Sequence, residues 1–250
     1  FHDGEINISN LGFNYNSRNI IKNLNLEIEG GKSTAIVGPT GCGKSTLTKL
    51  LFRFYDPYKG EISIDKQKLK DCKMDSIRSI IGVVPQDTIM FNNTIGYNLA
   101  YGNPKASMIE IRKVVKLCNL DDFIESLDLK YETIVGERGL KLSGGEKQRI
   151  AIARMMLKKP KILILDEATS ALDTKTEKSV LDSIDEYFKH TTKIIIAHRL
   201  TTIRSSDKIV VMSKGKIVEH GKHSNLITNK GLYYEMWNKQ KEIKKEANLV

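Results

Sequence analysis

Residues 38–45, Gly-Pro-Thr-Gly-Cys-Gly-Lys-Ser, constrain this chain more than any other stretch. The preceding Thr-Ala-Ile-Val at 34–37 predicts a buried strand, and apolar residues at helical spacing predict a helix over 44–54. Strand, glycine loop and helix form the context in which the pattern G-x-x-x-x-G-K-[ST] makes a phosphate-binding loop. The alternative, an ordinary glycine-rich turn, accounts for neither the flanking elements nor the Lys-Ser pair.

The fixed positions of this loop each have a chemical reason. Gly38, Gly41 and Gly43 let backbone N–H groups converge on phosphate oxygens, and the helix N-terminus adds about half a positive charge. Lys44 is placed to reach the β- and γ-phosphates, and Ser45 to ligate Mg²⁺. We therefore predict a nucleotide site made by Gly38, Pro39, Thr40, Gly41, Cys42, Gly43, Lys44, Ser45 and Thr46.

The composition is that of an ordinary soluble globular chain. The 250 residues are 40% hydrophobic and 28% charged, which suffices for a large domain with a core. No apolar run approaches the roughly 18 residues of a membrane helix. The three cysteines, Cys42, Cys72 and Cys118, lack metal-ligand spacing and fit free thiols in a reducing compartment. Because the chain starts at Phe1 without Met, we expect it to be a fragment.

The formal net charge of +10 indicates nucleic acid, an anionic membrane surface or a nucleotide as possible partners. The lysines, however, outnumber the arginines and are spread along the chain, and no block couples aromatic residues to a basic stripe. We therefore interpret the charge as solvated surface and expect no nucleic-acid partner.

Alternating apolar residues predict a small antiparallel sheet near the N-terminus. We expect strands at residues 5–15 and 24–28, with a turn between them, and a further strand at 61–64. Tyr15 closes the first strand, where an aromatic ring can stack on an adenine base. The pattern alone favours the other interpretation, a half-buried strand residue.

A helical insertion is predicted between two core strands. An apolar run at 80–84 predicts a strand, followed by Gln86, which is either a turn residue or a group that reaches the metal or the attacking water. Helical spacing then predicts helices over 106–118 and 121–127.

Leu-Ser-Gly-Gly-Glu at 142–146 precedes a long helical segment. Ser143 and Glu146 fit a capping box, with Ser143 as the N-cap. Because a box does not need the pair Gly144 and Gly145, the glycines predict a second anion-binding surface at a helix N-terminus. Two phosphate-binding ends in one chain indicate that one of them serves a neighbouring molecule.

Lys-Ile-Leu-Ile-Leu at 161–165 predicts a parallel strand buried on both faces. It ends in Asp166 and Glu167, and the carboxyl end of such a strand lies at the ligand crevice. Asp166 fits a Mg²⁺ ligand, and Glu167 fits the general base for water. Thr174 and Glu177 then predict a second capping box, for the next helix.

A further buried strand is predicted at 193–197, followed by His198, for which a γ-phosphate contact and a structural role both stay open. The predicted fold is α/β, a P-loop NTPase core with a mostly parallel sheet, an N-terminal antiparallel β subdomain and a helical insertion subdomain. We expect a single domain over residues 1–250, with its parts at about 1–70 (β subdomain), 88–157 (helical subdomain), 158–215 (second part of the core) and 216–250 (C-terminal hairpin and helices).

These motifs, in this order, resemble the nucleotide-binding domain of an ATP-binding cassette (ABC) transporter over about residues 5–238. The resemblance implies an ATPase that uses ATP and Mg²⁺, with Ser45, Gln86 and Asp166 around the metal. It implies that two copies bind two ATP molecules head to tail. The family's signature usually ends in Gln, where this chain has Glu146; because both can cap a helix, we expect function to survive.

The same resemblance implies a role for each remaining motif residue. Tyr15 is the adenine-stacking residue, and Lys44, Gln86, Glu167 as base and His198 as switch histidine are the catalytic set. Contacts made across the dimer are expected from Ser143, Gly144, Gly145 and Asp173.

A finer resemblance points to exporters, and residues 85–87 with 91–95 are similar to the multidrug-resistance class. Val-Gly-Glu-Arg-Gly at 135–139 is similar to the exporter loop that touches the transmembrane domain, so we expect that contact at Glu137, Arg138 and Gly139. The tail at 233–240 is similar to half-transporters of the mitochondrial and heavy-metal-tolerance branch. We therefore expect a soluble motor fragment on the cytosolic or matrix face of a membrane. The alternatives are a soluble ABC ATPase acting on nucleic acid or ribosomes and an importer subunit.

Overall fold

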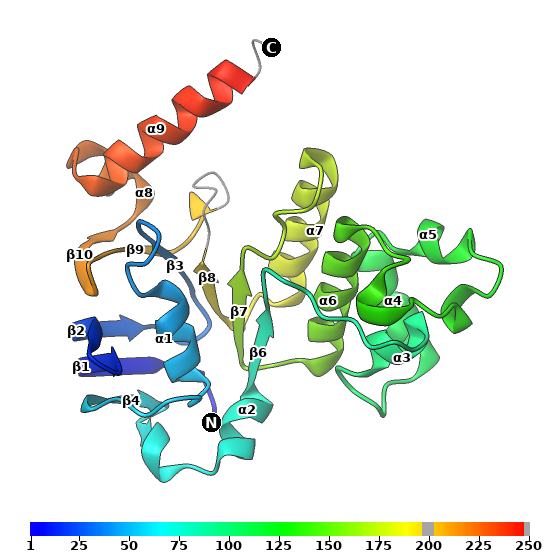
Figure 1. Ribbon diagram of the computed structural model, residues 1–250, viewed down its shortest axis with the longest axis horizontal. Coiled ribbons are helices and arrows are strands. Elements are labelled where there is room, and N and C mark those ends of the chain that lie inside the picture. The colour runs from blue at the N-terminus through cyan, green and yellow to red at the C-terminus, as the bar shows by residue number, and fades with distance from the viewer. Residues whose placement is uncertain (197–202, 248–250) are drawn as a thin grey trace. The chain divides into compact units, whose positions relative to one another are not determined.

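Two β-sheets and the helices attached to them are seen in the structure, a computed structural model that describes residues 1–196 and 203–247 (Figure 1). Contacts between residues divide the chain into two units. The first unit contains Phe1–Ile81, Lys161–Leu165 and His190–Val250, and the second contains Gly82–Pro160 and Asp166–Lys189. Within the described part of the chain, no helix combines the length and the apolar character needed to cross a membrane.

The first sheet confirms the antiparallel strands predicted near the N-terminus. Its order is β2-β1-β4-β5, with β1 (Ile6–Tyr15), β2 (Arg18–Ile28), β4 (Lys59–Ile64) and β5 (Gln67–Lys68). Ile8 of β1 lies opposite Leu26 on one side and Ile62 on the other, and all three side chains are buried. They share one face because side chains directly opposite each other on neighbouring strands point to the same side of the sheet.

The second sheet is mostly parallel, as predicted, in the order β10-β9-β3-β8-β7-β6. Its strands are β3 (Ser33–Val37), β6 (Ile81–Val84), β7 (Ile162–Asp166), β8 (Thr192–Ile196), β9 (Lys208–Ser213) and β10 (Lys216–Gly221). β3 lies between β8 and β9 and is parallel to both, and all its residues are buried. Complete burial of a short apolar strand is typical of a parallel sheet. β9 and β10 are antiparallel and form a hairpin, whose second strand begins the predicted C-terminal part at 216.

Helix α1 (Lys44–Leu51) follows β3, and η1 (Leu69–Asp71) and α2 (Met74–Ile80) lie further along the first unit. The helix predicted over 44–54 is wrong in its last turn. The helix ends because Arg53 has a left-handed backbone, with φ of 51°. Phe54 is consequently 58% exposed, with its ring stacked on Phe52 rather than buried on the helix face.

The C-terminal helices α8 (His223–Thr228) and α9 (Leu232–Ala247) belong to the first unit. They pack on the parallel sheet through a buried cluster, formed by Ala35, Val37, Ile203, Ile209, Val211, Leu226 and Tyr233. Glu219 of β10 accepts hydrogen bonds from the backbone N–H groups of Leu232 (2.5 Å) and Tyr233 (3.3 Å). The carboxylate therefore caps the first turn of α9 from a neighbouring strand.

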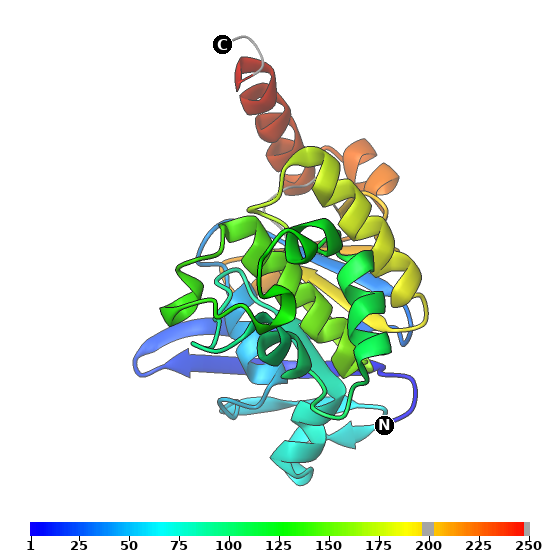
Figure 2. The same cartoon turned by 90° about the vertical axis from the view of Figure 1, so that its right-hand side faces the viewer.

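The second unit is helical, as Figure 2 shows from a second direction. Its helices are α3 (Ile95–Ala100), α4 (Met108–Leu117), α5 (Asp121–Glu125), η2 (Lys130–Glu132), η3 (Glu137–Gly139), α6 (Gly144–Lys158) and α7 (Thr174–Tyr187). Helices α3 and α4 both pack against α6. Asn98 is completely buried in α3 and binds backbone groups of Phe91 and Thr94 with its side chain.

We predict that Glu219→Ala loosens α9, because two first-turn N–H groups lose their acceptor. Loss of a helix cap typically costs about 1 kcal/mol. Trp237, the single tryptophan of the chain, packs against the cluster beneath α9 and reports the change. For Glu219→Ala we expect red-shifted tryptophan emission and a lower urea midpoint. Glu219→Gln should keep the emission and the midpoint close to those of the unmodified chain. Lys216→Ala, at an exposed position of the same strand, is the control; equal effects of the two alanine variants would contradict the assignment.

Candidate functional site

The loop between β3 and α1 has the curled backbone that the sequence predicts. Gly38, Gly41 and Gly43 have φ of 154°, 77° and 112°, values that L side chains rarely adopt. At Gly38 the space is also closed, because an added Cβ would meet the backbone oxygen of Met212 at 2.1 Å. Leu47 N–H donates to the carbonyl of Gly43 at 2.9 Å, so the helix begins immediately after the curl.

The ammonium of Lys44 lies inside this curl. Its Nζ donates hydrogen bonds to the carbonyls of Gly38 (2.7 Å) and Pro39 (3.2 Å), and the residue is only 7% exposed. Ser45, by contrast, is exposed on the first turn of α1, together with Pro39 and Thr40 on the loop. The loop therefore combines one enclosed positive charge with accessible backbone and a hydroxyl, as a phosphate site requires.

The turn between β9 and β10 is hydrogen-bonded to this loop. Gly215 N–H donates to the carbonyl of Cys42 (3.1 Å), and Lys22 N–H donates to the carbonyl of Gly215 (2.9 Å). Cys42 is buried, and its Sγ lies 3.8 Å from Nζ of Lys44. Strand, turn and loop are thus tied by backbone hydrogen bonds, which leave the loop's shape little dependent on its own side chains.

Tyr15 stands at the end of β1 within a group of aromatic rings. Its ring meets those of Phe13 and Tyr55 edge-on, with centroids 4.8 Å and 5.2 Å apart and interplanar angles of 90° and 87°. The ammonium of Lys49 lies 5.9 Å from its centroid. The two edge contacts set the plane of the Tyr15 ring. The sequence had not predicted Tyr55 as a partner, because it follows α1 and is far away in the chain.

In the second unit, α6 begins with the capping box that the sequence predicted. Oγ of Ser143 accepts from Glu146 N–H (3.2 Å), and Ser143 N–H donates to Oε2 of Glu146 (2.7 Å). Ser143 and Gly144 are exposed. Gly144 lies against Ala171, where an added Cβ would be 3.4 Å from the alanine Cβ. The box shows that Glu146 satisfies the capping requirement in this chain.

Asp166 ends β7, and Glu167 is the next residue. Glu167 has φ of 49°, in the left-handed region, which is uncommon for a residue with a side chain. Residues 167–172, called here the 167–172 turn, continue with hydrogen bonds from Ser170 N–H to the carbonyl of Glu167 and from Leu172 N–H to that of Thr169, both 3.1 Å.

The second predicted capping box, Thr174 with Glu177, is wrong. Asp173 is the N-cap of α7, and its Oδ1 accepts from the N–H groups of Lys175 (3.1 Å) and Thr176 (3.0 Å). Hydrogen bonds from the side chain and then the backbone of Thr176 hold the pKa of Asp173 below its usual value. Glu177 is buried and instead accepts from Oγ1 of Thr169 at 2.8 Å, so it supports the 167–172 turn.

Gln148 was not predicted, yet it joins these two segments. It lies on α6, is 2% exposed, and its amide oxygen accepts from Ala171 N–H at 2.9 Å. Its Nε2 donates to Oγ of Ser170 at 3.0 Å and to the carbonyl of Glu167 at 3.4 Å. A sequence signal existed, since Gln148 shares the buried helical face of Ala151 and Ile152 and a polar residue there needs partners.

The exporter-like loop belongs to a patch on the second unit. Val135 N–H donates to the carbonyl of Asn93 (3.1 Å), and an added Cβ at Gly139 would meet Met90 at 2.9 Å. Leu140 is 79% exposed. Exposed aromatic rings of Phe91, Tyr97 and Tyr101 contact one another, and Phe91 is next to Met90 in the chain.

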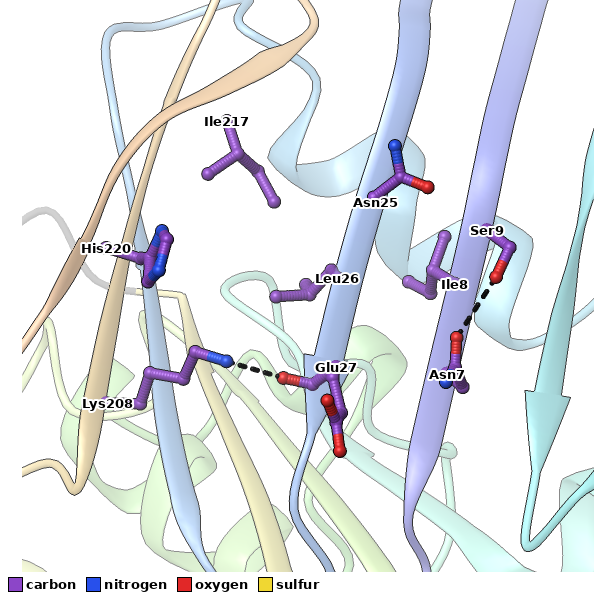
Figure 3. Close-up of a pocket in the computed structure, with 9 residues that line it drawn as sticks. All are labelled: Asn7, Ile8, Ser9, Asn25, Leu26, Glu27, Lys208, Ile217 and His220. Atoms are coloured by element: carbon purple, nitrogen blue, oxygen red, sulfur yellow. Dashed lines mark hydrogen bonds between the residues drawn. The ribbon is translucent and has the colours of Figure 1, made fainter.

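The structure thus gathers the predicted residues within each unit. The first unit contains Tyr15 and the loop Gly38–Thr46. The second contains exposed Gln86, together with Ser143, Gly144, Gly145, Asp166, Glu167 and Asp173. His198 lies outside the described residues. A separate groove, lined from β1, β2, β9 and β10, has Lys208 bonded to the carbonyl of Glu27 at 2.9 Å and contains none of these residues (Figure 3).

A glycine loop between a parallel strand and a helix defines the P-loop class of nucleotide-binding domains. The profile of the family described as "ABC transporter" matches residues 21–170. The chain belongs to the ABC transporter family, in which it is the nucleotide-binding domain, the ATPase part of the transporter.

Similar proteins place it more finely. The chain is 50% identical to the "ATM1-type heavy metal exporter" of Novosphingobium aromaticivorans, over 94% of this chain and 39% of that protein. It is 48% identical to the human "Iron-sulfur clusters transporter ABCB7, mitochondrial", over 92% of this chain and 31% of that protein. The solved structure of a bacterial Atm1-family ABC exporter with ATP bound has 49% identity and a TM-score of 0.94, covering 96% of this chain and 42% of that one. The chain spans about two fifths or less of these proteins.

Two of these three proteins are named exporters, and the names match the heavy-metal and mitochondrial branch that the C-terminal tail resembled. Their names agree with the predicted exporter class rather than with an importer or a soluble ATPase. The multidrug-resistance label fits these relatives more loosely than the heavy-metal and mitochondrial one.

We predict that Gly38→Ala damages the domain far more than Gly41→Ala. Both positions have positive φ, so each alanine carries backbone strain of about 1–2 kcal/mol. Only at Gly38 does the new Cβ also overlap a backbone atom, whereas at Gly41 no heavy atom lies within 4 Å. Urea midpoints and titration with a fluorescent ATP analogue measure the difference. Equal losses in the two variants would show that the carbonyl of Met212 does not shape the loop.

Proposed function

We propose that this domain binds and hydrolyses MgATP as one of two copies in an exporter, and that closure of the pair on ATP drives transport. The observation that carries the proposal is the presence of a phosphate loop in one unit and an exposed Ser-Gly-Gly helix start in the other. Two anion-binding ends on one chain suit a head-to-tail pair, in which each nucleotide meets the loop of one copy and Ser143 of the other.

The first unit supplies the ATP-binding half. Backbone N–H groups of the loop and the ammonium of Lys44 contact the phosphates, since Lys44 is already held inside the curl by two carbonyls. Phosphates would replace these carbonyls as partners, and a charge-assisted bond to an anion is the stronger one. The ring of Tyr15, oriented by Phe13 and Tyr55, is available to stack on adenine.

The donor set fits Mg²⁺. Ser45, Gln86 and Asp166 offer hydroxyl, amide and carboxylate oxygens, the hard ligands that this ion prefers. Mg²⁺ is usually held by one or two side chains, water and substrate phosphates, so this small donor set suffices. When bound, the ion would neutralise charge on the phosphates.

Hydrolysis would depend on Glu167 as the base that orients and deprotonates the attacking water. Its position directly after Asp166 places it at the carboxyl end of a buried strand, where ligands of α/β sheets bind. Gln86 and His198 are proposed to contact the water and the γ-phosphate. Most of the rate would come from positioning and electrostatics, because phosphoryl transfer needs little covalent chemistry from the protein.

The partner copy would complete the site. Ser143, Gly144 and Gly145 are proposed to contact the γ-phosphate of the partner's ATP, where the helix N-terminus favours negative charge. Because Gly144 and Gly145 carry no side chains, the backbone at the helix start is open to an approaching phosphate. Asp173 caps α7 and is proposed to contact the partner copy.

Coupling to a membrane domain is proposed at the exporter-like loop. Glu137, Arg138 and Gly139 lie beside exposed Leu140 and the aromatic patch of Phe91, Tyr97 and Tyr101. Exposed apolar patches of this kind mark protein contacts. The cargo is proposed to belong to the heavy-metal or iron–sulfur class that the relatives' names state, and the site of action to be a membrane, with this domain on its cytosolic or matrix face.

We predict that Glu167→Gln retains ATP binding and nearly abolishes turnover. Loss of a positioned base typically lowers the rate by about 10²–10⁴-fold. ATP should then hold two copies together, which size exclusion detects as a larger species. Hydrolysis close to that of the unmodified chain would exclude Glu167 as the base.

A second pair of variants separates the two half-sites. Lys44→Ala should lose nucleotide binding in the monomer, because the loop loses its charge. Ser143→Arg should bind ATP normally as a monomer but neither dimerise nor hydrolyse. Mixing the two leaves one intact site per heterodimer and should restore part of the activity. If Ser143→Arg weakens monomer binding as strongly as Lys44→Ala, the head-to-tail arrangement is wrong.

A further inference from the structure

Gln148 is a buried amide on the signature helix α6 whose partners all lie in the 167–172 turn. Its two polar atoms make three hydrogen bonds, to Glu167, Ser170 and Ala171, at 3.4, 3.0 and 2.9 Å. A buried amide is costly to leave unpaired. The side chain therefore fixes the distance between the helix and the turn.

The turn needs such a support because of the backbone at its first residue. Glu167 has φ of 49°, a conformation that persists only where the surroundings impose it, at about 1–3 kcal/mol for a residue with a side chain. Gln148 contacts the carbonyl of this same residue and the N–H of Ala171, so it binds both ends of the strained segment. Glu177 supports the middle through Thr169.

From this geometry we infer that Gln148 is a positioning residue for Glu167, which keeps the carboxylate aimed at the water without touching the nucleotide. The inference rests on the proposed function, because it takes Glu167 to be the base. Removing the support should lower kcat by roughly 10- to 100-fold, since a displacement of about 1 Å at a reacting group can cost 10²-fold. KM for ATP should change little, since Lys44 and Tyr15 lie in the other unit.

The test uses the heterodimer of Lys44→Ala and Ser143→Arg copies. Its one intact site takes its loop and Glu167 from the Ser143→Arg copy and its Ser143 from the Lys44→Ala copy. Gln148→Leu is introduced into either copy in turn. In the Ser143→Arg copy it should lower kcat by at least 10-fold, and in the Lys44→Ala copy by less than threefold. Equal losses in the two placements would overturn the inference, because a purely structural defect acts wherever it is placed.

Three variants are also measured with the same change in both copies. Asn98→Leu removes another fully buried amide of the same unit, far along the chain from the turn, and controls for lost stability; it should lower the melting temperature with kcat within threefold. Gln148→Glu keeps the acceptor for Ala171 N–H, so its kcat should lie between those of Gln148→Leu and the unmodified chain. Gln148→Leu with kcat within threefold of the unmodified chain would also overturn the inference.

The outcome for the proposed function is read separately. If the mixed copies regain no activity before Gln148 is changed, the head-to-tail site is wrong. The role of Gln148 is then decided by a double-mutant cycle of Gln148→Leu and Ser170→Ala, with both copies carrying the same change. Non-additive losses in kcat would support the hydrogen bond as the route to Glu167. Additive losses would overturn the inference.

Discussion

The close approach of Gly38 to the carbonyl of Met212 is the contact on which the rest of the phosphate loop depends. A side chain cannot occupy that space, so only glycine fits, and this glycine also has the positive φ with which the loop begins. The turn between β9 and β10 then fixes the loop through Gly215 and Cys42. The ammonium of Lys44 is drawn into the curl because the loop's own carbonyls face it. A contact far along the chain thus decides where a charge lies.

Much of this could be predicted from the sequence, because the signals are local. The glycine loop, the alternating strands and the box of Ser143 with Glu146 are set by neighbouring residues. The order of motifs predicted the family, and residues 135–139 and 233–240 predicted its exporter branch. The separate position of each motif in one of two units did not follow from local signals.

The failures involve contacts between distant residues. Phe54 fits the apolar spacing of α1, but the left-handed Arg53 ends the helix first. Thr174 and Glu177 have the spacing of a capping box, but Thr169 binds the glutamate and Asp173 takes the cap. Gln148 forms hydrogen bonds with residues about twenty positions away in the chain. Spacing rules for helices relate only residues three or four positions apart.

The left-handed backbone of Glu167 has a consequence for how such a domain evolves. Its strain lowers the free energy of unfolding, whether or not ATP is bound. A glycine would relieve it and remove the carboxylate. Selection for fold stability alone therefore acts against this residue, and under the proposed role of Glu167 as the base, selection for turnover retains it. A copy released from the need to hydrolyse ATP would be expected to change first here, and to become more stable as it loses activity.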